Sequence, residues 1–214
     1  MTASKKARAR VIGELLQKTY PQAHCELNFR NPLELLVATI LSAQCTDKRV
    51  NIVTERLFAR CQIAQDYADI SQAELEEIIH STGFFRNKAK NIRAMAGILL
   101  SQYQGEVPRE LASLASLPGV GRKTANVVLG NAFNINDGVV VDTHVGRLSR
   151  RLNLSKHTDP VKVEKDLMAL FPQNEWCQLS HWLIWHGRRR CTARKPDCAS
   201  CELREHCPSA GKVL

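Results

Sequence analysis

The 214-residue chain carries 30 lysine and arginine residues against 21 aspartate and glutamate residues, which gives a net charge of +9. A basic balance of this size favours a polyanionic partner, because the release of condensed counterions drives such binding. Purely apolar runs such as Leu35–Ala38 are too short to cross a membrane, and no apolar signal core follows the basic N-terminus, so we expect an intracellular protein.

The hydrophobic pattern predicts helices along nearly the whole chain. Residues 31–34 (Asn-Pro-Leu-Glu) offer an N-cap, a proline at the first helical position and a glutamate that can close a capping box. Residues 71–74 repeat this start signal, residues 158–160 start another helix, and apolar residues recur at helical spacing between Ile92 and Tyr103. Only residues 138–141 resemble a strand, and they are too few to build a sheet. The predicted helices span residues 5–19, 32–43, 47–60, 71–81, 86–104, 109–116, 121–132, 143–152, 160–170 and 174–188.

The sequence contains no repeat at solenoid period and no flexible linker, so a domain boundary is hard to locate. The loop 133–140 is the best candidate hinge, because it concentrates residues that favour turns. These residues are Asn134, Asn136, Asp137 and Gly138.

The most informative segment spans residues 117–128 and reads Leu-Pro-Gly-Val-Gly-Arg-Lys-Thr-Ala-Asn-Val-Val. A hairpin at residues 118–121 that opens directly into a helix aims backbone N–H groups outward, where they can hold a phosphate. Lys123 falls in the first turn of that helix, where the positive helix terminus and partial burial would favour the neutral, nucleophilic amine. Taken alone, however, Lys123 is more simply explained as a solvated surface lysine.

Asp142 begins the segment Asp-Thr-His-Val at residues 142–145. Its simplest role is the N-cap of the helix that starts at Thr143. Capping uses one carboxylate oxygen and fixes the position of the group, so the same aspartate can also serve catalysis.

Four of the eight cysteines crowd near the C-terminus in the pattern C-x6-C-x2-C-x5-C. A structural zinc site usually uses paired knuckles, and only one close pair is present here. The wide, irregular spacing favours an iron–sulfur cluster, with zinc and inert cysteines as alternatives. Basic residues surround this loop, and they are either a solvated face or a phosphate-binding surface. They are Arg188, Arg189, Arg190, Arg194 and Lys195.

Together these motifs resemble endonuclease III, a family of helix-hairpin-helix DNA glycosylases with an associated lyase activity. The resemblance rests on residues 117–128, on Val-Asp-Thr-His-Val at 141–145, on Leu-Ser-Ala-Gln-Cys-Thr-Asp-Lys at 41–48 and on the four cysteines. It implies an all-α fold with a six-helix barrel domain, an iron–sulfur cluster domain and the DNA cleft between them. The expected bounds are 24–134 for the barrel and 1–23 with 135–214 for the discontinuous cluster domain.

The resemblance also assigns roles to residues. Lys123 becomes the nucleophile and Asp142 its acidic partner, while one 4Fe–4S cluster is held by Cys191, Cys198, Cys201 and Cys207. Gln44 would enter the space left by a flipped base, Phe84 would be an apolar wedge facing the opposite strand, and His144 would lie near the active site. The simpler role for Phe84 is core packing, and for His144 that of a satisfied residue at a helix start. The expected DNA-binding residues are Gln44, Phe84, Gly119, Val120, Gly121, Arg122, His144, Arg194 and Lys195.

The implied function is base excision repair of double-stranded DNA that contains damaged bases or abasic sites, with no membrane partner. The implied enzyme excises oxidised pyrimidines, breaks the strand 3′ to the abasic site through a lysine Schiff base, and works as a monomer in a bacterial-type, nucleoid-associated cytoplasmic location. A glycosylase without lyase activity and a non-catalytic DNA-binding module are the alternatives. Lys123 argues against the first, because a water nucleophile needs no amine at that position.

Overall fold

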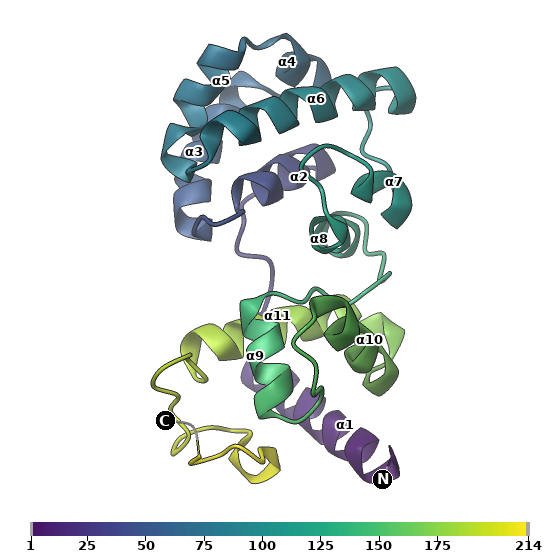
Figure 1. The fold of residues 1–214 in the computed structure, drawn as a ribbon, viewed down its shortest axis with the longest axis vertical. Helices are drawn as coiled ribbons and strands as arrows, with labels where there is room; N and C mark the ends of the chain where they lie inside the picture. The colour runs from purple at the N-terminus through teal and green to yellow at the C-terminus, as the bar shows by residue number, and fades with distance from the viewer. Residues whose placement is uncertain (1, 213–214) are drawn as a thin grey trace. The chain divides into compact units, whose positions relative to one another are not determined.

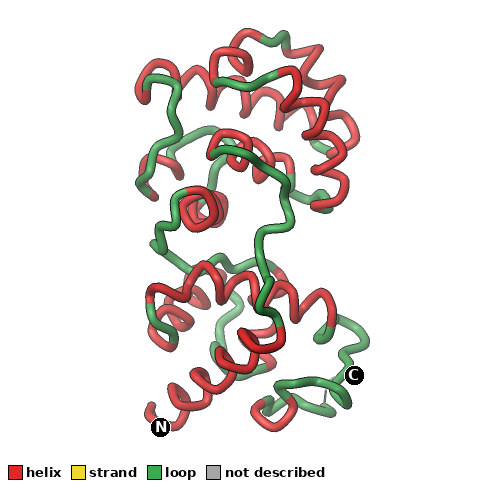
Figure 2. The backbone as a smooth tube through the Cα atoms, turned by 180° about the vertical axis from the view of Figure 1, so that it is seen from behind, coloured by secondary structure: helices red, strands yellow, loops and turns green. Residues whose placement is uncertain are grey.

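In the computed structural model, which describes residues 2–212, every regular element within that range is a helix (Figures 1 and 2). The all-α prediction is therefore confirmed. Residues 138–141 form no strand. Their valines are buried, and the Val140 N–H donates to Ser180 Oγ at 2.9 Å. A side chain of the helix Trp176–Arg189, rather than a neighbouring strand, thus supplies the acceptor for this backbone N–H.

The described residues form two compact units. One spans residues 25–135, and the other combines the residues up to 24 with those from 136 onward. Each unit has its own hydrophobic core. The assignment of residues 24–134 to a barrel domain and of 1–23 with 135–214 to a cluster domain stays a prediction.

The central unit, residues 25–135, is built around α2, whose side chains are buried from Leu33 to Leu41. The helix α6 packs against α4 and α5, while α2 and α7 both pack against α8 (Figure 1). The elements are α2 (Pro32–Leu41), α3 (Asp47–Arg60), α4 (Ala64–Asp69), α5 (Gln72–Ile79), the 3₁₀ turn η1 (His80–Thr82), α6 (Phe85–Tyr103), α7 (Leu111–Ala115) and α8 (Arg122–Ala132).

The helix start signals read from the sequence are confirmed at three places. The side chains of Asn31, Ser71 and Asp159 each accept a hydrogen bond from a backbone N–H in the first turn of the following helix. The capping box expected at Glu34 is wrong, because the Glu34 carboxylate does not bond the N–H of the N-cap residue Asn31. The Glu34 carboxylate accepts from the backbone N–H and the guanidinium of Arg30, one residue before the N-cap.

The helix α4 was not predicted from the sequence. It begins after Ile63, a poor capping residue, and its start is stabilised from inside the first turn. The Asp66 carboxylate accepts hydrogen bonds from the N–H groups of Gln62 at 2.7 Å and Ile63 at 3.0 Å, which lowers the pKa of that carboxyl. An acid at this position takes the role of the N3 side chain in a capping box, which bonds the N–H of the N-cap residue.

The second unit packs α9 against α11, with α1 lying on α10 and α11 (Figure 1). Its core contains buried residues from all four helices and from the C-terminal loop. None of the described helices is long and apolar enough to span a bilayer. The elements are α1 (Thr2–Thr19), α9 (Thr143–Arg151), α10 (Pro160–Leu170), the 3₁₀ turn η2 (Gln173–Glu175), α11 (Trp176–Arg189) and the 3₁₀ turn η3 (Arg204–His206).

Candidate active site and cluster loop

The hairpin between α7 and α8 leaves the start of α8 open. The Val120 N–H closes the turn on the Leu117 carbonyl at 3.0 Å, and Gly121 takes the N-cap position of α8. A glycine N-cap has no side chain to bond the first-turn N–H groups, unlike the polar N-caps of α2, α3 and α5. The positive end of α8 therefore faces outward without a side-chain cap, as an anion site requires.

The two hairpin glycines serve different purposes. Gly119 has φ +77°, and a Cβ added there would lie 3.0 Å from Cβ of Asn91 on α6. Gly121 has φ −93°, which any residue adopts, and a Cβ there would meet nothing within 4 Å. Gly119 is thus required by the fold, whereas the absence of a side chain at Gly121 leaves open space beside the helix terminus.

This contrast gives a stability prediction. We expect Gly119→Ala to lower the free energy of unfolding by about 2 kcal/mol or more. The reason is that alanine would be forced into a left-handed backbone conformation and its Cβ would clash with Cβ of Asn91. Gly121→Ala should stay within about 0.5 kcal/mol of the original chain. Urea denaturation of the two variants measures this, and equal losses at both positions would contradict the distinction.

Lys123 and Arg122 occupy the first turn of α8, and both side chains are exposed. The expectation that Lys123 is partly buried is therefore wrong. Its place at the positive end of α8 is as the sequence predicted, and its amine is accessible to a ligand.

Gln44 and Phe84 lie in two loops of the same unit. Gln44 is exposed in the turn between α2 and α3, and Phe84, 65 % exposed, is the N-cap of α6. The neighbouring Phe85 turns inward and packs against the core and the His80 ring, whose centroid lies 4.5 Å away. The simpler role of Phe84 as a core residue is therefore wrong.

Asp142 and His144 belong to the other unit, at the start of α9. The Asp142 carboxylate accepts a hydrogen bond from the Val145 N–H at 2.8 Å, which confirms the N-cap prediction. His144 Nδ1 lies 3.1 Å from Arg147 Nη2, and burial lowers the pKa of His144. The same Arg147 nitrogen donates to the carbonyls of Gly187 and Cys191, so α9 is tied to α11 and to the cysteine loop.

The four C-terminal cysteines line one pocket between α9, α11 and the C-terminal loop. All four are half-buried and none forms a disulfide. Apolar side chains of Leu148, Leu152 and Leu203 close the pocket floor. Four soft thiolate donors around one largely apolar pocket fit an iron–sulfur cluster.

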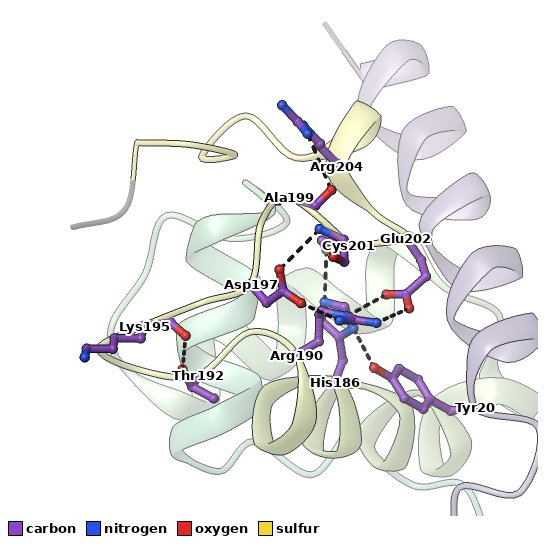
Figure 3. Close-up of polar contacts among 11 residues, drawn as sticks. Tyr20, His186, Arg190, Thr192, Lys195, Asp197, Ala199, Cys201, Glu202 and Arg204 are labelled. Carbon is purple, nitrogen blue, oxygen red and sulfur yellow. Dashed lines mark hydrogen bonds and ion pairs between the residues drawn. The ribbon is translucent and has the colours of Figure 1, made fainter.

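Hydrogen bonds fix the loop around these cysteines. Arg151 on α9 donates to Cys191 Sγ at 3.2 Å and to the Thr192 carbonyl at 2.7 Å. His186 lies between Tyr20 and the cysteine loop, with Nδ1 3.0 Å from the Tyr20 hydroxyl and Nε2 3.5 Å from Cys201 Sγ (Figure 3). Arg147 and Arg151 were not predicted from the sequence, where their only signal is a spacing of four residues on one helix.

The basic residues of the loop do not form one uniform surface. Arg190 pairs with Asp197 at 2.6 Å and with Glu202 at 2.9 Å (Figure 3), and the Arg189 guanidinium stacks on Trp185. Two acids of the same loop therefore neutralise the charge of Arg190. Arg194 and Lys195 are exposed at the loop tip.

Comparisons with known proteins agree with this geometry. Residues 37–173 match the family model of the HhH-GPD superfamily base excision DNA repair proteins, and residues 191–207 match the iron-sulfur binding domain of endonuclease III. The endonuclease III of Synechocystis is 56 % identical over 97 % of this chain and 95 % of its own. The chain belongs to the endonuclease III family.

Two further comparisons extend this result. The endonuclease III of Bacillus subtilis is 47 % identical over 90 % of this chain and 88 % of its own. A solved structure described as a trapped endonuclease III–DNA covalent intermediate shares 47 % identity with a TM-score of 0.92, and covers 97 % of both chains. As a member of this family, the chain is a base excision repair DNA glycosylase with AP lyase activity, and its C-terminal domain is the family's 4Fe–4S domain.

Proposed function

We propose that this enzyme removes oxidised pyrimidines from duplex DNA and then cleaves the strand 3′ to the abasic site through a Schiff base on Lys123. The observation that carries the proposal is the exposed Lys123 amine in the first turn of an uncapped helix. Support comes from the relative of 47 % identity whose structure is described as a covalent intermediate with DNA.

The chemistry follows from an amine nucleophile. The neutral amine of Lys123 attacks C1′ of the deoxyribose, and the C1′–N bond to the base breaks as the base leaves with the bonding electron pair. The amine loses a proton to the departing base, and the nitrogen lone pair breaks the C1′–O4′ bond, so that the sugar ring opens to a protonated imine while O4′ takes a proton from water. The protonated imine acidifies the proton on C2′, and its removal expels the 3′ phosphate by β-elimination. Hydrolysis of the imine then frees Lys123.

Asp142 acts on the same nucleotide as an electrostatic partner. Its carboxylate stabilises the positive charge that develops on the sugar, or accepts a proton during the attack. The Val145 N–H holds one carboxylate oxygen in place. His144, half-buried and held by Arg147, contributes an imidazole whose pKa is lowered by burial.

The remaining proposed residues hold and distort the DNA. Backbone N–H groups around Gly119, Val120, Gly121 and Arg122 grip a phosphate at the hairpin. A base inside a duplex must leave the stack before it can be processed, and Gln44 and Phe84 fill the vacated space. Both side chains are exposed and therefore available for insertion.

For the cofactor, we propose Cys191, Cys198, Cys201 and Cys207 as the ligands of the 4Fe–4S cluster. When bound, the cluster joins four points of one loop and so gives that loop a defined shape. The residues around it serve the same purpose, since Arg151 donates to a backbone carbonyl of the loop and Arg190 pairs with two of its carboxylates. We further propose that the enzyme works as a monomer on chromosomal DNA in the nucleoid.

One experiment tests the proposed function against its alternatives. The holoenzyme is incubated with a duplex that carries one oxidised pyrimidine, and with a duplex that carries one abasic site. Base release with a β-elimination end supports the proposal. Base release without strand cleavage would point to a glycosylase that uses water, and binding without either product would point to a non-catalytic module.

The exposed loop tip gives a prediction about binding. Charge reversal at both positions, Arg194→Glu with Lys195→Glu, should reduce the slope of log affinity against log salt by roughly two, because each phosphate contact contributes about one. Charge reversal of Arg10 and Lys18 on α1 provides a control of equal net charge. Titrations of a labelled duplex at several salt concentrations measure the slope, and an unchanged slope would show that the tip is a solvated face.

A further inference from the structure

The loops that carry Gln44 and Phe84 have an unusual backbone in common. Gln44 has φ +54° and Phe84 has φ +47°, both in the left-handed region that residues other than glycine rarely adopt. Such conformations persist only where the surrounding structure holds them. The two exposed side chains proposed to enter the DNA stack therefore depend on something nearby that fixes their main chain.

The side chain of Lys88 on α6 contacts the main chain beside both loops. Lys88 is only 5 % exposed, and its ammonium donates hydrogen bonds to the carbonyls of Leu41 and Thr82, both at 2.8 Å. Leu41 ends α2 three residues before Gln44, and Thr82 ends η1 two residues before Phe84. One buried ammonium thus joins the main chains of both loops.

Lys88 also holds Phe84 directly. Its backbone N–H donates to the Phe84 carbonyl at 3.1 Å, in the first turn of α6. The carbonyls at the ends of α2 and η1 lack partners within their own helices, and a cation is the favourable donor there. Lys88 therefore contacts the Phe84 loop through both its backbone and its side chain, and the Gln44 loop through its side chain.

A role in packing alone does not account for a lysine at this position. Burial lowers the pKa of Lys88, which reflects the cost of removing its charge from water. An apolar side chain would fill the same volume without that cost, but it would leave two buried carbonyls without a donor. A lysine at this position is therefore explained by its hydrogen bonds to the two carbonyls, which belong to the main chain beside the two loops.

We propose that Lys88 is a positioning residue that holds Gln44 and Phe84 in register with each other, so that both enter the DNA stack together. This inference rests on the proposed function, because it assumes that these two side chains enter the duplex. Lys88 itself, being buried, touches no DNA.

The decisive variant is Lys88→Met, which keeps the length of the side chain and removes its donors. Its comparison is Leu99→Ala, a core truncation on the same helix, about 16 Å further along at 1.5 Å per residue. Leu99→Ala lowers stability without touching either loop. Both holoenzymes are assayed well below their melting temperatures on a lesion duplex that carries 2-aminopurine beside the lesion, so that fluorescence reports unstacking.

For Lys88→Met we expect the 2-aminopurine signal and the single-turnover rate of base release to fall roughly ten- to a hundredfold, the usual cost of misplacing a positioning group. Leu99→Ala should retain both. Because Lys88 is proposed to act through both Phe84 and Gln44, the loss in the Lys88→Met, Phe84→Ala double variant should exceed that of Phe84→Ala alone but fall short of the sum of the two single losses. Normal unstacking in Lys88→Met, or additive losses in the double variant, would overturn the proposal.

Misfolding of Lys88→Met and failure of the proposed function can each be distinguished from failure of the Lys88 proposal. If Lys88→Met does not fold, Lys88→Gln replaces it, because the shorter amide can reach only one carbonyl; a folded Lys88→Gln protein with full unstacking overturns the proposal. If the unmodified holoenzyme unstacks the duplex but releases no base and cleaves no strand, the proposed function fails while the unstacking comparison still decides the role of Lys88.

Discussion

Lys123→Gln is expected to abolish the covalent adduct that borohydride traps between enzyme and DNA, and to slow base release by roughly a thousandfold or more. Borohydride reduces the imine, and an amide side chain forms none. Gln and Lys have similar helix propensities, and Lys123 is exposed, so the fold should change by less than about 0.5 kcal/mol. The measurement is the yield of cross-linked complex on a denaturing gel, beside single-turnover base release.

The matched control is Lys48→Gln. Lys48 is also exposed and is the second residue of α3, as Lys123 is the second residue of α8. Its variant should trap DNA as the unmodified enzyme does. An adduct that survives in Lys123→Gln would assign the nucleophile to another amine. Loss of the adduct in both variants would show that the missing positive charge weakens DNA binding, rather than that the nucleophile has been removed.

The sequence predicted most of the helices because their start signals are local. Asn31, Ser71 and Asp159 bond within the next turn, so the few residues around each cap contain the information. The helix α4 escaped prediction because its start uses an acid inside the first turn and an apolar N-cap residue. A cap of that form has no distinctive N-terminal residue to read.

Residues that act across the fold could not be read from the pattern. Lys88 stands in a polar run of α6 that is typical of a solvated surface, yet its ammonium donates to the carbonyl of Leu41, 47 positions earlier. Arg190 reads as part of a basic run and is neutralised by Asp197 and Glu202. In both cases the partner is chosen by tertiary packing, which hydrophobic periodicity does not encode.

The motif at residues 117–128 indicated the hairpin correctly, but it could not separate the purposes of its two glycines. Gly119 is fixed by a positive φ and by Asn91, which lies far away in sequence, whereas Gly121 has an ordinary backbone. Similarly, the motif placed Lys123 at the helix start but did not reveal that its side chain is exposed. Local conformation was predictable, and contacts with other helices were not.

Asp142→Asn should slow base release by roughly a hundred- to a thousandfold while DNA affinity stays nearly unchanged. The reason is that the substitution separates two functions of one side chain. Asparagine is as good an N-cap as aspartate, so its side-chain oxygen can still accept from the Val145 N–H and keep the start of α9 in place. Only the negative charge that we propose acts on the reacting sugar is lost.

The control for this variant is Asp159→Asn, at the N-cap of α10 in the same unit. Asp159 accepts from the Lys162 N–H at 2.9 Å, the same contact that Asp142 makes, but no catalytic role is proposed for it. Both variants should melt within a few degrees of the unmodified enzyme, and only Asp142→Asn should lose activity in single-turnover assays. If Asp142→Asn instead loses stability and activity together, while Asp159→Asn loses neither, the carboxylate serves the fold of α9 rather than the chemistry.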